Sequence, residues 1–204
     1  MTRRALILVD VQQEYFSGPL AIQYPPVKES LANILSVIDV AEQAGIPVAV
    51  IRHEYPADFP VFGAGSPGQE LHPDIAARAT DAWKPVTKSW ASIFAGTDLD
   101  EWVRENDVDT LTLVGYMTNN CIIGTAADAE PRGLTVEVLS DATGAINLSN
   151  SAGSAPAQQV HETLMVLLNS NFAAVGTTAA WQSAVADNQP LAGSNLIDSA
   201  TQEQ

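Results

Sequence analysis

Short apolar runs that alternate with amphipathic stretches constrain the fold of this chain more than any other feature. Residues 5–9 read ALILV, 46–51 read IPVAVI and 110–116 read TLTLVGY. Such runs are typical of strands that are buried on both faces. Between the first two runs, residues 27–44 carry apolar side chains at helical spacing. This alternation predicts an α/β protein with a parallel sheet and helices on both faces of it.

The remaining elements follow from the same patterns. We expect further strands at 85–88, 134–141 and 172–176, and further helices at 98–105, 121–131 and 161–169. Residues 54–81 are rich in Pro and Gly without a clear period, and a connection of this length is usually a functional loop or lid. We therefore predict one domain over residues 1–181. The polar tail over 182–204 is expected to be disordered or to pack on a neighbouring subunit.

Charge and cysteine content exclude several classes of function. The 204 residues include 24 acidic and 9 basic side chains, which gives a net charge of −15. A nucleic-acid binder needs a basic face, and so does a protein that docks on anionic lipid, so we expect neither partner. A single cysteine rules out an intrachain disulfide framework. The apolar run after the N-terminus is too short for a signal peptide, so we expect a cytoplasmic protein.

Three reactive side chains are predicted to meet at one edge of the sheet. Asp10 follows the first strand, Lys88 ends the strand at 85–88, and Cys121 comes just after the strand at 110–116. In parallel α/β sheets, functional sites form at the carboxyl ends of the strands, where the strand order switches direction. A helix start and a nearby ammonium both favour a thiolate, and a carboxylate can carry its proton. Together they describe acyl transfer through a thioester on Cys121.

Each of these residues also has an ordinary structural interpretation. A single cysteine at a helix start is often a small buried apolar residue. An aspartate that ends a strand is often a turn or cap residue, and Lys88 could be surface charge. The coincidence of all three on one edge favours the catalytic interpretation more than any one of them does.

Longer motifs around these residues resemble a known family. The motifs are LILVDVQ at 6–12, K-x-x-x-S-x-F-x-G-T-D-L at 88–99 and LVGYMTNNCIIGTAADAEPRGLTVEVLSDAT at 113–143. Over residues 5–180 the chain resembles the isochorismatase-like cysteine hydrolases, which include nicotinamidases, N-carbamoylsarcosine amidase, ureidoacrylate hydrolase and streptothricin hydrolase. The resemblance implies a three-layer Rossmann-like fold of about six strands. It also implies a homodimer or larger homo-oligomer, in which a neighbour can close the pocket.

The resemblance further implies specific site residues. Asp10, Lys88 and Cys121 match the catalytic Asp-Lys-Cys triad of the family. A cis peptide is implied between Tyr116 and Met117, and the backbone N–H groups of Met117 and Cys121 are implied as the oxyanion hole. No cofactor is implied for such a hydrolase.

Departures from the family narrow the expected reaction. Nicotinamidases carry an Asp-x-His metal motif where this chain has Arg52, His53 and Glu54, so nicotinamidase activity is not expected. His53 and His72 could pair as metal ligands, but no third ligand is evident, and we predict no metal site. True isochorismatases lack the cysteine, so Cys121 favours hydrolysis of a C–N bond over hydrolysis of a vinyl ether. His161 has a counterpart in many relatives and is expected to be structural.

Two further patterns concern the pocket. Residues 63–68 match G-x-G-x-x-G, but the prolines at 60, 67 and 73 break the strand and helix that a dinucleotide site needs, so we interpret the match as part of a flexible lid. Side chains near the triad are candidates for an aromatic-lined pocket, although each could equally be structural. These are Gln12, Phe16, Trp90, Phe94 and Tyr116.

The sequence therefore supports one leading hypothesis and two alternatives. The leading hypothesis is a cofactor-free cysteine hydrolase of a small amide or carbamoyl compound. The first alternative is a catalytically silent relative that binds a ligand or partner, and the second is vinyl-ether hydrolysis on the same scaffold. The sequence does not identify the substrate.

Overall fold

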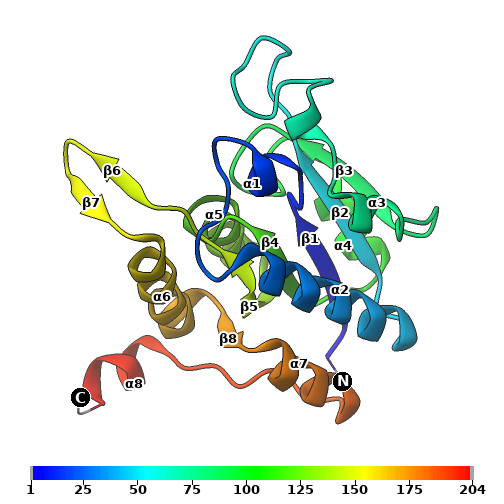
Figure 1. The fold of residues 1–204 in the computed structure, drawn as a ribbon. Coiled ribbons are helices and arrows are strands. Elements are labelled where there is room, and N and C mark those ends of the chain that lie inside the picture. Colours follow the sequence, from blue (N-terminus) through cyan, green and yellow to red (C-terminus); the bar gives the residue numbers. More distant parts are fainter. Residues whose placement is uncertain (1, 203–204) are drawn as a thin grey trace.

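A six-stranded parallel sheet forms the centre of the protein (Figure 1). The structure is a computed structural model and describes residues 2–202. The strands lie in the order β3-β2-β1-β4-β5-β8. Their bounds are β1 (Arg4–Val9), β2 (Val48–His53), β3 (Lys84–Lys88), β4 (Thr110–Tyr116), β5 (Thr135–Gly144) and β8 (Ala174–Gly176). The α/β fold with a six-stranded parallel sheet confirms the fold that the sequence predicted.

Helices cover both faces of this sheet. The longer ones are α2 (Val27–Gln43), α4 (Leu99–Glu105), α5 (Ile123–Ala129), α6 (Ala157–Leu167) and α7 (Thr178–Ala186). Short helices are α1 (Glu14–Ser17), α3 (Pro73–Ala76) and α8 (Leu196–Thr201). Among residues 2–202, no helix is both long enough and apolar enough to cross a bilayer.

The sequence of β1 explains how the sheet separates two cores. Side chains alternate between the faces of a strand, so a strand that is apolar throughout must be covered on both sides. Ile7 and Val9 pack into one cluster together with side chains of α4, α5 and α6. Leu6 and Leu8 pack into the other cluster together with side chains of α2 and α7. All six residues of β1 are buried, so this strand lies between the two cores within the sheet.

The strand order reverses direction between β1 and β4. The chain builds outward from β1 through β2 to β3 and then returns to the other side of β1 with β4. Ligands of such sheets bind outside the carboxyl ends of the strands at this switch point. Gly115 lets β4 pass close to β1 there, because a Cβ atom on it would lie 2.1 Å from the carbonyl oxygen of Val9. Its φ of +105° also favours glycine.

Several predicted elements differ in their ends. β2 begins and ends two residues later than predicted, so that His53 is its last residue. β5 continues to Gly144, and α6 begins at Ala157, so that His161 lies inside the helix. A hairpin of β6 (Leu148–Asn150) and β7 (Gly153–Ala155), absent from the sequence prediction, projects away from the sheet (Figure 1).

The structure differs from the predicted domain boundary after residue 181. That boundary falls inside α7, where the Gln182 amide bonds to the Ser36 hydroxyl of α2 at 2.8 Å. The chain then runs back along its own sheet, where Leu191 is buried and its N–H donates to Glu137 at 3.0 Å. The first part of the tail therefore packs on its own domain, and α8 follows as an exposed short helix.

Candidate active site

Asp10, Lys88 and Cys121 meet at the carboxyl edge of the sheet. The Lys88 Nζ atom lies 2.7 Å from Asp10 Oδ2 and 3.2 Å from Cys121 Sγ. The exposed fractions of Asp10, Lys88 and Cys121 are 0%, 2% and 1%, so the cluster is closed to solvent in this structure. The structure therefore brings together the three residues that the sequence predicted at one edge.

Local structure explains the position of each side chain. Asp10 follows β1 with a φ of +50°, a left-handed conformation that aspartate tolerates better than most residues. Lys88 is the last residue of β3 and pairs in register with His53 at the end of β2. Cys121 lies in a single π-helical turn, Thr118–Ile122, which joins β4 to α5. The cysteine is thus in a turn ahead of the α-helix.

The Lys88 ammonium is fully paired by three neighbours. Besides Asp10 and Cys121, it lies 2.9 Å from the Nδ1 atom of His53. An ammonium has three N–H donors and no acceptor, so each of the three contacts uses one donor. Asp10, His53 and Cys121 also form a group whose ligand atoms lie within 4.8 Å of one another, close enough to hold a metal ion. In this structure the lysine supplies the positive charge at their centre.

Unpaired polar atoms gather at the same edge. Among the described residues, the buried side-chain atoms without a hydrogen-bond partner are Asp10 Oδ1, His53 Nε2 and Asn119 Oδ1. Buried polar atoms are normally paired, so unpaired ones need an explanation. Asp10 and His53 contact Lys88, and Asn119 belongs to the turn that carries Cys121. This edge consequently has free hydrogen-bonding capacity for a ligand.

Burial and charge set the protonation of the site. Burial and the Asp10 carboxylate raise the pKa of the Cys121 thiol well above its usual range, although Lys88 acts in the opposite direction. Burial alone would lower the pKa of Lys88, but Asp10 and Cys121 together raise it. Burial, with the Lys88 charge, lowers the pKa of His53 to about 4. These surroundings disfavour a thiolate at Cys121, in the opposite direction to the effect expected from a helix start.

Aromatic side chains that sequence reasoning did not select cover the cluster. The ring of Phe62 lies 5.2 Å from Tyr15 and 5.2 Å from His53, and the ring of Tyr55 lies 4.4 Å from His53. Burial is the largest cause of the raised pKa of Tyr15, and its proximity to Cys121 and Asp10 acts in the same direction. Tyr55 and Phe62 belong to the Pro- and Gly-rich connection, where no periodicity marks a residue as buried. Their aromatic character inside a long loop was the available signal.

The predicted pocket residues Gln12, Trp90 and Phe94 lie in different environments. The Gln12 amide donates to the carbonyl oxygens of His53 and Gln69 and accepts from the His53 N–H, so it ties the long connection to β2. Trp90 is 66% exposed. Phe94 is buried in the core cluster on the face of α4 and α5, with the Arg132 guanidinium 4.4 Å above its ring. Gln12 and Phe94 are thus buried and Trp90 is exposed, and the pocket role of these three residues stays a prediction.

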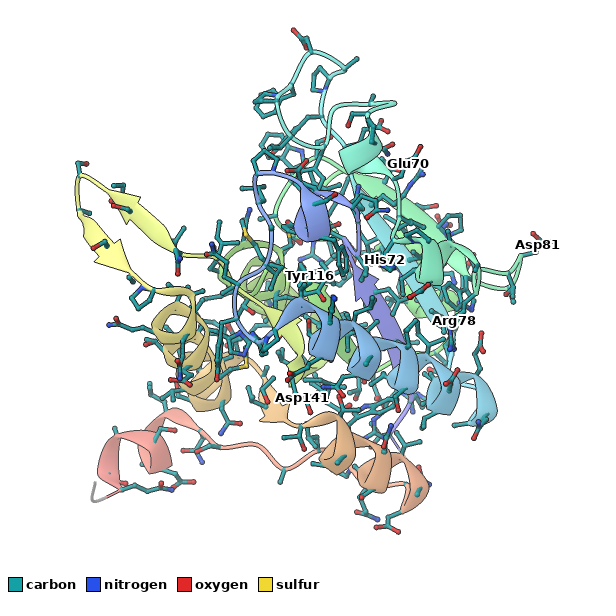
Figure 2. The ribbon with its side chains drawn as sticks, in the orientation of Figure 1. Glu70, His72, Arg78, Asp81, Tyr116 and Asp141 are labelled. Atoms are coloured by element: carbon teal, nitrogen blue, oxygen red, sulfur yellow. The ribbon has the colours of Figure 1, made fainter. Side chains whose placement is uncertain are left out.

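Phe16 and Tyr116 do lie together. Their ring centroids are 5.7 Å apart, and the Tyr116 hydroxyl pairs with Ser30 of α2 at 2.7 Å. The His72 ring also packs against Phe16, with the ring centroids 4.3 Å apart, and Figure 2 labels both Tyr116 and His72. His72 is not a member of the group formed by Asp10, His53 and Cys121.

The turn that carries Cys121 is held from both ends. The peptide bond between Tyr116 and Met117 is cis, and the Met117 carbonyl accepts the N–H groups of Asn120 and Ile122. Thr118 bonds to His161 Nδ1 at 2.9 Å, and His161 Nε2 lies 2.9 Å from the carbonyl of Ser140. His161 therefore connects the turn to β5, in line with its predicted structural role. The oxyanion role of the Met117 and Cys121 N–H groups stays a prediction.

Comparison with known proteins assigns the chain to a family. Residues 4–180 match the model of the isochorismatase domain. The chain belongs to the isochorismatase family. This confirms the resemblance found in the sequence, and with it a hydrolase.

Individual relatives cover most of the chain. A crystal structure of a candidate isochorismatase from Burkholderia xenovorans LB400 is 48% identical, covers 98% of this chain and 95% of its own, and superimposes with a TM-score of 0.95. The secreted isochorismatase effector of Verticillium dahliae is 33% identical over 68% of this chain and 71% of its own. The nicotinamidase/pyrazinamidase of Mycobacterium tuberculosis is 30% identical over 71% of this chain and 88% of its own. The similarities therefore include both an isochorismatase and an amidase.

Proposed function

We propose that this isochorismatase-family hydrolase cleaves a C–N bond in a small amide or carbamoyl compound through a thioester on Cys121. The observation that carries the proposal is the buried cluster in which Lys88 contacts both Asp10 Oδ2 and Cys121 Sγ. Asp10 Oδ1 remains unpaired beside them, so one carboxylate oxygen is free to take a proton. The similarity to a nicotinamidase/pyrazinamidase supports amide chemistry.

The charge balance of the cluster supports a proton transfer that accompanies attack. A neutral thiol, a carboxylate and an ammonium sum to zero, whereas a thiolate would leave one uncompensated negative charge in a buried site. The raised pKa of Cys121 follows the same logic, because burial and Asp10 both oppose the thiolate. Asp10 therefore accepts the thiol proton while Sγ attacks the substrate carbon. Lys88 keeps the other carboxylate oxygen in place.

Acylation and deacylation then use the same three groups. In acylation the S–C bond forms, the C–N bond breaks, and Asp10 passes the proton to the leaving amine or ammonia. In deacylation a water attacks the thioester carbon, Asp10 accepts the water's proton, the C–S bond breaks, and the proton returns to the sulfur. The N–H groups of Met117 and Cys121 are the proposed donors to the oxyanion in both steps. The predicted absence of a cofactor fits this sequence of steps, which needs none.

The closed site supports a small substrate. The buried rings of Phe62 and Tyr15 cover the cluster of Asp10, Lys88 and Cys121 with apolar surface. A substrate therefore reaches the sulfur only when the covering segment moves, which fits the predicted lid. The homo-oligomer and the cytoplasmic location stay predictions that light scattering and cell fractionation can test.

The proposal is tested by a screen of small amides and carbamoyl compounds for ammonia release. We expect turnover by the native protein, loss of turnover in Cys121→Ala with an unchanged circular dichroism spectrum, and a trapped acyl adduct on Cys121 by mass spectrometry. An undiminished rate of ammonia release by Cys121→Ala would contradict the thioester route.

Two other outcomes point to the alternatives. Pyruvate release from isochorismate that survives Cys121→Ala would indicate vinyl-ether hydrolysis, which the similarity to the Verticillium dahliae isochorismatase effector favours. Binding of an amide without turnover would indicate a silent relative. Alkylation rate alone does not separate these cases, because the thiol is buried and its pKa is raised even if the enzyme is active.

A further inference from the structure

Two buried histidines of this protein are paired differently. His161 uses both ring nitrogens: Nδ1 contacts the Thr118 hydroxyl and Nε2 contacts the Ser140 carbonyl, each at 2.9 Å. His53 uses only one, because Nδ1 lies 2.9 Å from Lys88 Nζ whereas Nε2 is buried without a partner. Buried polar atoms are normally paired, as both nitrogens of His161 are, so the unpaired Nε2 of His53 needs an explanation.

The lysine determines where His53 carries its proton. An ammonium can only donate hydrogen bonds, so the Nδ1 atom of His53 must accept one and cannot carry hydrogen. The neutral ring therefore carries its single N–H on Nε2. A carboxylate or a carbonyl next to Nδ1 would select the opposite tautomer, and Lys88 excludes it.

Aromatic rings enclose His53 beside the triad. The rings of Tyr55 and Phe62 pack against the His53 ring at 4.4 and 5.2 Å. The residue itself is 4% exposed, so water does not readily replace a partner. In such surroundings a single hydrogen bond to a ligand is stronger than at a wet surface.

We propose that His53 binds the substrate through its Nε2–H, and that the substrate therefore carries a hydrogen-bond acceptor separate from its scissile carbonyl. The inference rests on the proposed function, in which the carbonyl oxygen goes to the backbone donors of the turn and Asp10 Oδ1 handles the proton. The imidazole N–H is then left for a second group, such as a ring nitrogen, a further carbonyl or a carboxylate. His53 acts as a specificity-determining residue, and Lys88 orients it in addition to orienting Asp10.

The tautomer is tested first, without any substrate. Nitrogen-15 NMR of the labelled native protein near neutral pH should show His53 with hydrogen on Nε2 and a bare Nδ1. His161 is the internal reference, because its Nε2 faces a carbonyl and must also carry the hydrogen. Hydrogen on Nδ1 of His53, or an imidazolium, overturns the inference whatever the enzyme hydrolyses.

Substrate selection is tested with amides that differ by one acceptor. The probes are nicotinamide and its two ring isomers against benzamide, and succinamate against butanamide, titrated into the Cys121→Ala protein. We expect at least one acceptor-bearing probe to bind roughly tenfold more tightly than its partner, which is the scale of one buried hydrogen bond, and to shift the His53 Nε2–H signal. Equal affinity within every pair, or no binding by any probe, overturns the inference.

Variants separate binding from a merely structural role. In the Cys121→Ala background, His53→Phe should remove the preference within the pair, whereas His53→Gln, which retains an acceptor for Lys88 and an N–H donor, should keep part of it. His161→Gln is the matched control and should leave the preference intact. An equal loss of affinity for both members of a pair in His53→Phe indicates a structural role and overturns the inference. Failure of native turnover on every probe counts against the proposed function alone, because the tautomer and the binding preference are measured without catalysis.

Discussion

Two buried ion pairs at opposite ends of β1 differ in how completely they are paired. At the start of the strand, Arg4 meets Glu137 at 2.8 Å with both side chains buried. Just past its end, Lys88 meets Asp10 at 2.7 Å, also fully buried. The first pair joins β1 to β5, and the second lies at the proposed site.

Hydrogen-bond accounting separates the two pairs. Both oxygens of Glu137 are used: Oε1 accepts from Arg4 and the Leu191 N–H, and Oε2 accepts from Arg4, Thr112 and Trp181. Asp10, in contrast, keeps one oxygen free. A saturated buried pair holds a structure, whereas a buried pair with a spare acceptor is costly unless a ligand or a proton uses it. The contrast supports the proposed role of Asp10 without reference to any relative.

Asp10→Asn should have the largest effect on activity. The amide cannot accept the thiol proton. The rate of ammonia release should therefore fall by roughly 10³-fold or more, which is the scale expected for the loss of a general base. The measurement is kcat on whichever amide the native protein hydrolyses. Glu137→Gln is the control at the other pair and should retain kcat per folded molecule, and a similar loss in both variants would remove the distinction drawn here.

Glu137→Ala should have the largest effect on stability. It leaves the Arg4 charge buried and removes the acceptor of Thr112 and of the Leu191 N–H, and one of the two acceptors of Trp181. Breaking a buried pair in this way costs about 3–5 kcal/mol of unfolding free energy, which urea denaturation measures. A loss below about 1 kcal/mol would show that this pair is not a structural anchor.

The free energy of unfolding should also decrease as the pH is lowered, because of His53. Its pKa is about 4 in the folded protein and 6.5 as the unperturbed reference, so the unfolded chain binds the proton first as pH decreases. The contribution is fully present above pH 6.5 and is lost between pH 6.5 and 4, by about 3 kcal/mol in total. Urea denaturation across this range should show a smaller decrease for His53→Gln than for the native protein. Parallel curves would show that His53 titrates normally.

The smallest effect is expected at an exposed pair. Lys84 and Asp98 form a salt bridge at the surface, where the Asp98 side chain is 60% exposed. Exposed pairs contribute about 0–1 kcal/mol and are screened by salt. Asp98→Asn should therefore leave the urea midpoint almost unchanged, and a loss comparable to that of Glu137→Ala would contradict the ranking by burial.

The sequence predicted the sheet and the position of the triad because both depend on local patterns. Apolar runs indicate buried strands. Polar residues that follow parallel strands all lie at the same edge of the sheet, because the strands end there. The packing of Phe62 and Tyr55 over His53 depends on a loop that has no period, so no pattern could place them. Leu191 packs on the sheet although polar residues surround it in the sequence. Its backbone N–H donates a hydrogen bond to Glu137, a contact that no local pattern shows.

The closed wall around the sulfur has a chemical consequence beyond catalysis. Peroxide reacts with thiolates rather than with neutral thiols, and it must reach the sulfur to form a sulfenic acid. The sole cysteine of this chain is 1% exposed, and burial raises the pKa of its thiol. The same enclosure therefore slows the oxidation of the proposed nucleophile.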